Sequence, residues 1–299
     1  MAEAPVTMRE RLEYTGITVA LGLLRRLPYR ARVRLAGRAM VALSGPLGLR
    51  ARVRENLAHV LPDLPAAEVE ALERAVPDTI GRLFIEEFSP DGLDTMARAA
   101  WFGGPGVAAL EEARAAGRPI IIASGHIGNY DAYRRALLQR GFNVGSLYRP
   151  FNNRPFDRRY RAVMEDGGGV LFARGRAGMA GMVRHLRAGG VLGVLHDQHM
   201  DRGADLRFFG KPAMTATSAA DLALKYDALL VPVYGIRRLD GLHFDLVTEA
   251  PIPHGDPLAM TQALNDSLEA QVRAHMGQWI WTHRRWKVPR RRQAQAGAI

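Results

Sequence analysis

From residue 107 onward, short apolar runs alternate with stretches whose apolar positions repeat at helical spacing. The runs expected to be strands are 119–123, 143–148, 170–172, 191–195 and 229–236. The helical stretches between them are 107–116, 129–140, 155–166, 177–187 and 218–226. This alternation predicts an α/β fold in which helices cover both faces of a mostly parallel sheet. Residues 243–247 alternate apolar and polar positions, which predicts an antiparallel edge strand.

The first 60 residues show a different pattern. The apolar run 17–24 is bounded by Arg25 and Arg26 and is far shorter than the roughly 20 residues that cross a bilayer. The segment is expected to form basic amphipathic helices that break near Pro28 and near residues 44–46. We expect it to attach to an anionic membrane surface; the alternative is helices that only pack on the core. The chain is therefore divided into this segment (1–60), one large domain (61–292) and a tail (293–299).

Residues 119–140 combine a buried-type strand, a turn and a helix. Asn129 is a suitable N-cap for the helix and Gly141 a suitable stop. His126 and Asp131 stand five positions apart, which on one helix would separate them by about 140°, at roughly 100° per residue. The two side chains can therefore meet only if His126 lies in the turn and Asp131 in the first helical turn.

An imidazole oriented by a carboxylate is the pairing that a general base requires. The chain contains no cysteine, and Ser124-Gly125-His126 does not fit the G-x-S-x-G motif of serine hydrolases. A base without a protein nucleophile indicates direct activation of a substrate hydroxyl. The alternative is structural: His126 would cap the turn and Asp131 would complement the helix dipole.

The H-x-x-x-x-D pattern after a strand resembles the acyltransferase motif of the glycerolipid and lipid A acyltransferases. Further stretches, in family order over about residues 115–290, resemble the lipid A biosynthesis lauroyl/myristoyl acyltransferases, with weaker similarity upstream. These stretches are Tyr148-Arg149-Pro150 with Asn152, Asn153 and Phe156-Asp157; Asp197-Gln198; Phe208-Phe209-Gly210; Thr215-Ala216-Thr217; and Trp281-Thr282-His283-Arg284-Arg285-Trp286-Lys287. The resemblance implies a glycerolipid-acyltransferase-like domain.

The resemblance also implies roles for individual residues. His126 would take the proton from the acceptor hydroxyl, with Asp131 as its orienting partner. Arg149 would bind a phosphate or stabilise the developing oxyanion. Asp197 and Gln198 would organise the arginines or bind the acceptor sugar.

Four of the candidate residues directly follow predicted strands: His126, Arg149, Arg174 and Asp197. Because ligands of open parallel sheets bind at the carboxyl ends of the strands, we expect these residues to share one edge. Arg174, with Arg176 close by, is a candidate for binding a phosphate-bearing substrate.

Two further features of the sequence leave alternatives open. His196 and His199 flank the Asp-Gln pair and could form a metal site with His126, but no H-E-x-x-H motif is present and the resemblance requires neither metal nor cofactor. Residues 279–287 mix aromatic rings with cations, as both nucleic-acid platforms and membrane interfaces do. The resemblance favours the lipid enzyme and makes Arg284 a substrate-binding candidate.

The formal charge of +11 comes mostly from arginine, because lysine stands only at Lys211, Lys225 and Lys287. Residues 14–54 contain nine arginines and no acidic residue. Guanidinium groups suit planar contacts with phosphates. The expected partners are an acidic acyl carrier protein, a phosphorylated glycolipid acceptor and an anionic membrane surface, with no nucleic acid.

Taken with the resemblance, these features predict transfer of a fatty acyl group from acyl carrier protein to a hydroxyl of a lipid A precursor. The reaction would form an acyloxyacyl ester during lipopolysaccharide synthesis, at the cytoplasmic face of the bacterial inner membrane. The closest alternative is an acyltransferase for a lysophospholipid or another glycolipid. The others are a basic nucleic-acid-binding protein and an inactive membrane-binding relative.

Overall fold

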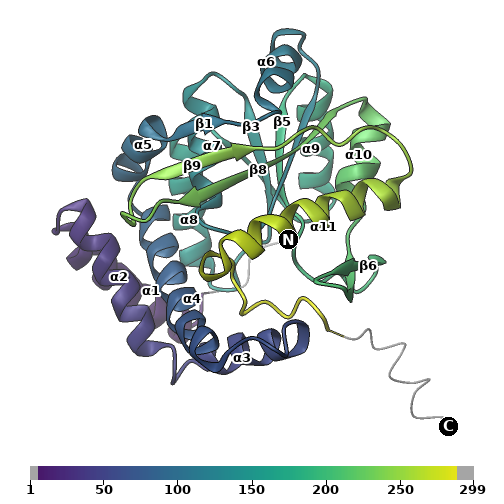
Figure 1. Ribbon diagram of the computed structural model, residues 1–299. Coiled ribbons are helices and arrows are strands. Elements are labelled where there is room, and N and C mark those ends of the chain that lie inside the picture. The colour runs from purple at the N-terminus through teal and green to yellow at the C-terminus, as the bar shows by residue number, and fades with distance from the viewer. Residues whose placement is uncertain (1–5, 288–299) are drawn as a thin grey trace.

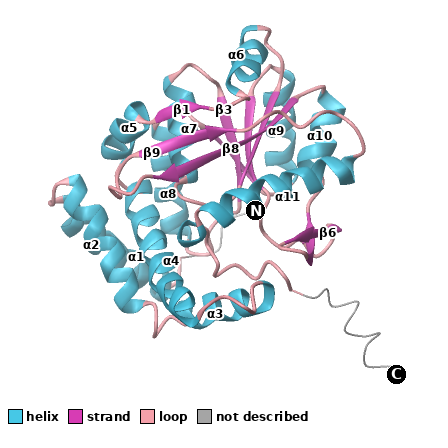
Figure 2. Ribbon diagram, in the orientation of Figure 1, coloured by secondary structure: helices cyan, strands magenta, loops and turns pink. Residues whose placement is uncertain are grey.

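The computed structural model describes residues 6–287 and confirms an α/β fold. A seven-stranded sheet has the order β1-β9-β8-β2-β5-β3-β4, and β6 and β7 form a separate antiparallel hairpin. The strands are β1 Trp101–Gly103, β2 Ile120–Ser124, β3 Val144–Tyr148, β4 Val170–Ala173, β5 Val191–Leu195, β6 Ala204–Phe208, β7 Lys211–Thr215, β8 Leu229–Arg237 and β9 Phe244–Thr248. Figure 2 shows the sheet between layers of helices.

The helices of the described chain fall into an N-terminal group and a group around the sheet (Figure 1). The first group is α1 Met8–Arg25, α2 Tyr29–Leu43, α3 Leu49–Val60 and α4 Ala66–Glu87. The second is α5 Pro90–Ala99, α6 Val107–Ala115, α7 Tyr130–Gln139, α8 Arg154–Asp166, α9 Arg176–Arg187, α10 Ser218–Tyr226 and α11 Pro257–Ala274, after which Met276–Gln278 forms a 3-10 turn.

The central strands are apolar throughout because both of their faces are covered. All five residues of β2 are buried. Ile120 and Ile122 belong to the core under α5, α6 and α7, whereas Ile121 and Ala123 belong to the core under α9, α10 and α11. Alternate side chains of β2 therefore pack against the two helical layers, as the uninterrupted apolar run predicted.

The strand directions confirm a mostly parallel sheet, but the edge beside β9 differs from the prediction. Strand β2 pairs in parallel with both β5 and β8, and β3 pairs in parallel with both β4 and β5. Strand β9 is antiparallel to β8, as predicted, but it is not the edge, because the three-residue β1 pairs with its outer side. The hairpin of β6 and β7 was not predicted.

The turn and helix after β2 form as expected. The Asn129 side chain accepts hydrogen bonds from the backbone N–H groups of Asp131 and Ala132, at 2.9 and 3.0 Å, and so caps α7. Gly141 follows the helix with φ +82°, a left-handed conformation that glycine adopts without strain.

The N-terminal helices break where predicted, at residues 26–28 between α1 and α2 and after Leu43. Helices α2 and α3 pack against α4 (Figure 1). No helix among residues 6–287 is long and apolar enough to cross a membrane. The predicted tail, 293–299, lies outside the described residues.

Candidate active site

His126 and Asp197 meet at the carboxyl edge of two neighbouring strands. Ser124, the last residue of β2, lies opposite Leu195, the last residue of β5, so the segments that follow run side by side. His126 donates from its backbone N–H to Asp197 Oδ2 at 2.7 Å and from Nδ1 to Asp197 Oδ1 at 2.7 Å. Two hydrogen bonds from one residue to one carboxylate fix both the backbone turn and the imidazole ring.

The Asp197 carboxylate is fully buried and remains ionised. Trp279 Nε1 donates a third hydrogen bond to it, at 2.9 Å. Burial alone would raise the pKa of Asp197, but the His126 ring, which attracts the carboxylate and hydrogen-bonds to it, holds that pKa well below its usual range. A carboxylate that accepts from Nδ1–H leaves Nε2 of His126 free to take a proton. The His126 side chain is 15% exposed, so solvent or substrate reaches it.

Asp131, the predicted partner of His126, is engaged elsewhere. Its fully buried carboxylate accepts hydrogen bonds from Arg134 Nε and, at 2.7 Å, from Arg135 Nε, and Arg135 also donates to Asp94 at 2.8 Å. The expected pairing of His126 with Asp131 is therefore wrong. The reason is local: positions three and four residues apart share one face of a helix, so the two arginines reach the Asp131 carboxylate from within α7.

His283 completes the cluster and was missed from the sequence. Its ring lies 4.6 Å from the His126 ring, edge to face, and its Nε2 is buried without a hydrogen-bond partner among residues 6–287. Burial, reinforced by His126, lowers the pKa of His283 to about 4, so the ring is neutral at physiological pH. The sequence did contain a signal for His283, because this residue lies in the stretch 281–287 from which Arg284 was selected as a substrate-binding candidate.

A buried acid lies behind the His126 ring. Tyr130 packs edge to face on His126, with ring centroids 5.3 Å apart, and donates from its hydroxyl to Glu87 Oε1 at 2.7 Å. Burial raises the pKa of Glu87 to about 7, and the Asp131 carboxylate adds to this increase. Glu87 therefore interacts with both the His126 cluster and the arginine-bound Asp131.

Comparisons with known proteins identify the family. Residues 7–288 match the sequence profile of the bacterial lipid A biosynthesis acyltransferases. The chain belongs to this family. It is 28% identical to a phosphatidylinositol mannoside acyltransferase of Mycobacterium tuberculosis over 241 residues, 79% of this chain and 76% of the relative.

Two more relatives carry related names. A phosphatidylinositol mannoside acyltransferase of Mycolicibacterium smegmatis is 26% identical over 239 residues, 79% of each chain. A lipid A biosynthesis acyltransferase of Haemophilus influenzae is 24% identical over 280 residues, 90% of this chain and 86% of the relative. The predicted resemblance is confirmed, and the protein is an acyltransferase of the lipid A acyltransferase family.

Three other predicted residues of this acyltransferase, Arg149, Arg174 and Gln198, lie at the same sheet edge but outside the His126 cluster. Arg149 and Arg174 are exposed and directly follow β3 and β4. Neighbouring strands are about 4.8 Å apart, so β3 lies about 10 Å and β4 about 14 Å from β2 across the sheet. Gln198 follows Asp197 and is exposed, whereas Arg284 lines a separate pocket beside α3. The shared edge of the four strand-end residues is thus confirmed, and among them Asp197 is the one that hydrogen-bonds to His126.

The histidines on either side of the Asp-Gln pair contact other groups. His196 Nε2 lies 3.2 Å from the backbone oxygen of Leu264, and His199 Nε2 lies 3.1 Å from Asp201 Oδ1. No group of three or more His, Cys, Asp or Glu side chains within residues 6–287 could hold a metal ion. The metal alternative has no ligand set in the described part of the chain.

Proposed function

We propose that this acyltransferase moves a fatty acyl group from acyl carrier protein to a hydroxyl of a lipid A precursor. The observation that carries the proposal is the His126–Asp197 pair, an oriented and reachable base at the strand ends of a lipid A acyltransferase family member. Nε2 of His126 takes the proton of the acceptor hydroxyl, and the oxygen attacks the thioester carbonyl. The tetrahedral intermediate collapses to the ester and expels the thiolate, which takes the proton from the imidazolium.

The remaining residues have supporting roles in the proposal. Arg149, on the same sheet edge, binds a substrate phosphate or stabilises the oxyanion, while Arg174 and Gln198 contact the acceptor. Asp131 acts indirectly, by holding Arg134 and Arg135 and thereby the first turn of α7. No cofactor is required, because the thioester is already an activated acyl donor.

The acceptor has a second candidate. The phosphatidylinositol mannoside acyltransferases match at 28% and 26% identity, so a phosphatidylinositol mannoside is the specific alternative among other glycolipids. Both candidates are phosphorylated glycolipids, and the same base serves either hydroxyl. Mass spectrometry of products formed from acyl carrier protein donors with each acceptor separates them.

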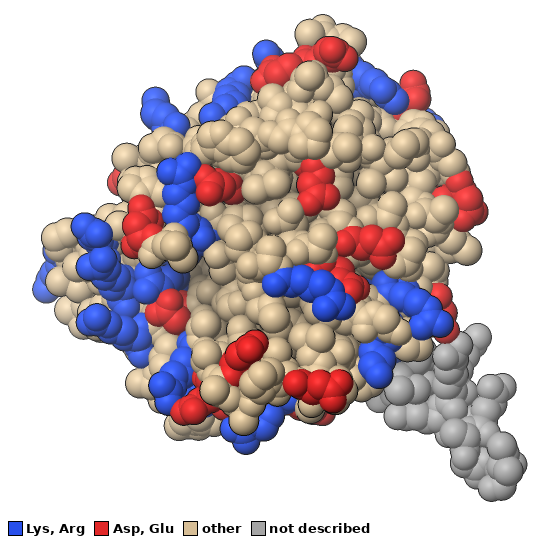
Figure 3. Space-filling view, in the orientation of Figure 1, with Lys and Arg blue, Asp and Glu red and all other residues tan. Residues whose placement is uncertain are grey.

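We place the enzyme at the cytoplasmic face of the inner membrane, held there by α1 and α2. Arg30, Arg34 and Arg38 of α2 are exposed and four positions apart, hence on one face. Figure 3 shows basic side chains gathered on the side of the molecule that α2 occupies in Figure 1. Exposed apolar side chains of the two helices are Met8, Leu12, Val19, Leu23, Leu35 and Leu43. Co-sedimentation with anionic but not neutral vesicles is the expected result, and equal binding to both would contradict it.

His126→Ala tests the chemistry. Because the variant lacks the base, acyl transfer should fall by at least about 10²-fold, with far-UV circular dichroism unchanged. His243→Ala is the matched control, because His243 Nδ1 also contacts an aspartate, Asp240 Oδ2 at 2.5 Å, but on the exposed turn before β9. Full activity of His126→Ala would overturn the proposal. Salt-sensitive nucleic-acid binding that survives the change, without acyl transfer by wild type, would favour the nucleic-acid-binding alternative.

A further inference from the structure

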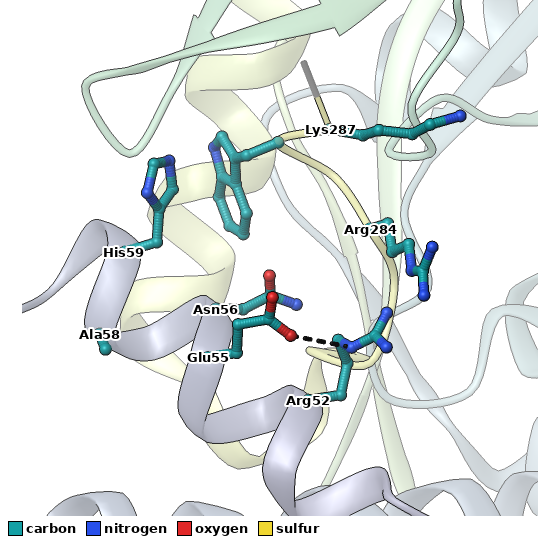
Figure 4. Close-up of a pocket in the computed structure, with 8 residues that line it drawn as sticks. Arg52, Glu55, Asn56, Ala58, His59, Arg284 and Lys287 are labelled. Atoms are coloured by element: carbon teal, nitrogen blue, oxygen red, sulfur yellow. Dashed lines mark ion pairs between the residues drawn. The ribbon is translucent and has the colours of Figure 1, made fainter. Parts of the chain in front are cut away.

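A pocket of about 670 Å³ opens between α3 and the segment that follows α11. In Figure 1 this yellow segment passes between α3 and the β6 hairpin. The residues that line the pocket are Arg52, Glu55, Asn56, Ala58, His59, Arg284, Trp286 and Lys287 (Figure 4). It is distinct from the His126–Asp197 pair, since neither of those residues lines it.

The pocket wall carries more positive than negative charge. Arg52, Arg284 and Lys287 line it together with His59, and the acidic lining residue is Glu55, whose Oε2 lies 3.2 Å from Arg52 Nε. Figure 4 shows the guanidinium groups of Arg52 and Arg284 on the same side of the opening. Lys287 Nζ lies 3.6 Å from Asp201, a weak and largely exposed pair.

Arg284 and Arg285 are neighbours with opposite surroundings. Arg285 is fully buried and donates to the Met214 carbonyl, Thr215 Oγ1 and Asn265 Oδ1, so its guanidinium supports the fold. Arg284 is exposed and forms no ion pair or side-chain hydrogen bond with any residue between 6 and 287. The guanidinium of Arg284 therefore remains available to a ligand.

The pocket is coupled to the candidate active site through the backbone. Asn56 of α3 donates from Nδ2 to the carbonyl oxygens of Trp281 and, at 2.9 Å, His283. His283 contacts the His126 ring, and Arg284 is the next residue, with its Cα about 3.8 Å from that of His283. Arg284 is therefore adjacent in the chain to a residue of the His126 cluster, and Asn56 of α3 holds the peptide group between His283 and Arg284.

We propose that this pocket binds the phosphate of a phosphate ester carried by one of the two substrates. This inference rests on the proposed function and specifies how a substrate is held. Two guanidinium forks on one side of the opening match the oxygens of a phosphate, and the Lys287 ammonium adds a point charge. The Trp286 indole N–H is already donated to the Phe208 carbonyl at 3.1 Å, so the ring offers an apolar wall for the sugar or alkyl group beyond the phosphate.

The phosphate could belong to the acceptor headgroup or to the phosphopantetheine arm of the donor, and soluble probes separate the two. Isothermal titration calorimetry would compare glucosamine 1-phosphate and glycerophosphoinositol, as acceptor-like probes, with 4′-phosphopantetheine, as the donor-like probe. Glucosamine, myo-inositol and pantetheine, which carry no phosphate, are the corresponding controls. A phosphate ester should bind at least about tenfold more tightly than its phosphate-free analogue, and added salt should weaken that binding.

Matched variants locate the binding. Arg284→Gln should weaken phosphate-ester binding about tenfold, and Arg52→Gln with Arg284→Gln more, whereas Arg98→Gln should leave it unchanged because Arg98 is an exposed arginine on α5 outside the pocket. Circular dichroism and Tm establish that each variant is folded. Equal binding of phosphorylated and phosphate-free probes by wild type, or equal affinity of wild type and the double variant, would overturn the inference.

The failure of this inference can be distinguished from that of the proposed function. The calorimetric test involves no acyl transfer, so it can be carried out on an inactive protein. Lack of activity on every acceptor would refute the proposed function, and the binding measurement would still test the pocket. In an active preparation, Arg284→Gln should raise KM for the substrate whose phosphate occupies the pocket and leave KM for the other substrate unchanged. No rise in either KM would count against the pocket, whatever the chemistry at His126.

Discussion

Two buried aspartates near the same end of the sheet have different partners. Asp131, in the first turn of α7, is held by Arg134 and Arg135, whereas Asp197, after β5, is held by His126 and Trp279. Both carboxyl groups are fully buried, and both have a pKa below the usual range because their cationic or donor partners outweigh burial. Burial and a lowered pKa alone therefore do not distinguish the two sites.

The difference lies in whether the partner can exchange a proton. An arginine guanidinium stays protonated throughout the accessible pH range, so Asp131 with its two arginines is a permanent ion cluster. An imidazole ring can accept a proton from a substrate and give it back, and the Asp197 carboxylate fixes the orientation of the His126 ring. Under the proposed mechanism, the motif H-x-x-x-x-D therefore joins the base, His126, to a carboxylate that is bound by arginines, and the carboxylate that contacts His126 follows another strand.

Asp197→Asn should have the largest effect on activity. The amide keeps the shape of the side chain but lacks the charge that stabilises the imidazolium and fixes its tautomer, so turnover should fall on the order of 10³-fold. Single-turnover kinetics at saturating donor and acceptor would measure the loss, with Tm as the check on folding. Turnover within tenfold of wild type would show that Asp197 does not orient His126.

Asp131→Asn should instead affect stability. It leaves Arg134 without its carboxylate partner and Arg135 with only Asp94, and removing one partner of a buried ion cluster costs about 3 kcal/mol of the free energy of unfolding. Urea unfolding would measure the loss, and turnover per folded molecule should fall less than tenfold. If the free energy of unfolding of the variant were unchanged and turnover were lost, Asp131 would instead be a catalytic partner of His126.

The sheet could be predicted because burial on two faces leaves a clear trace in the sequence. Strand β2 is apolar at every position except its last, and β8 is buried along its whole length, so both stood out as uninterrupted runs. The parallel order then placed His126, Arg149, Arg174 and Asp197 at one edge without further information.

What the sequence did not reveal depends on contacts between distant segments. Strand β1 has three residues and is only partly covered. Strand β6 alternates apolar and polar residues, but its partner β7 begins with Lys211-Pro212 and shows no such alternation, so the hairpin as a pair gave no strong pattern. Asp131 is near His126 in sequence, whereas Asp197 is 71 residues away and reaches it through the pairing of β2 with β5. Spacing along the chain favoured the nearer carboxylate.

Glu87 interacts with both the His126 cluster and Asp131, and its burial should make the free energy of unfolding depend on pH. Its pKa is raised from an ordinary 4.5 to about 7, chiefly by burial. Between pH 4.5 and pH 7, Glu87 is ionised in the unfolded chain but protonated in the folded protein. The free energy of unfolding is therefore highest below about pH 4.5 and falls as the pH rises to about 7. Glu87→Gln removes this dependence and should gain about 2 kcal/mol relative to wild type between pH 5 and pH 8, at about 1.4 kcal/mol per pKa unit. Urea unfolding of both proteins at each pH would measure it, and parallel pH profiles would contradict the burial argument.

Asn56→Ala should have the smallest effect, and that effect should be confined to the region around His126. It removes the hydrogen bonds from α3 to the carbonyls of Trp281 and His283, while leaving the arginines around Asp131 intact. Asn56 is itself buried, so the loss of its two hydrogen bonds should lower the free energy of unfolding by about 1–2 kcal/mol. Turnover should fall a few fold as His283 loses its restraint beside His126. Asn56→Asp, which sets a carboxylate against the same two carbonyls, should lower turnover further, whereas equal activity of both variants with wild type would mean that the position of His283 does not depend on α3.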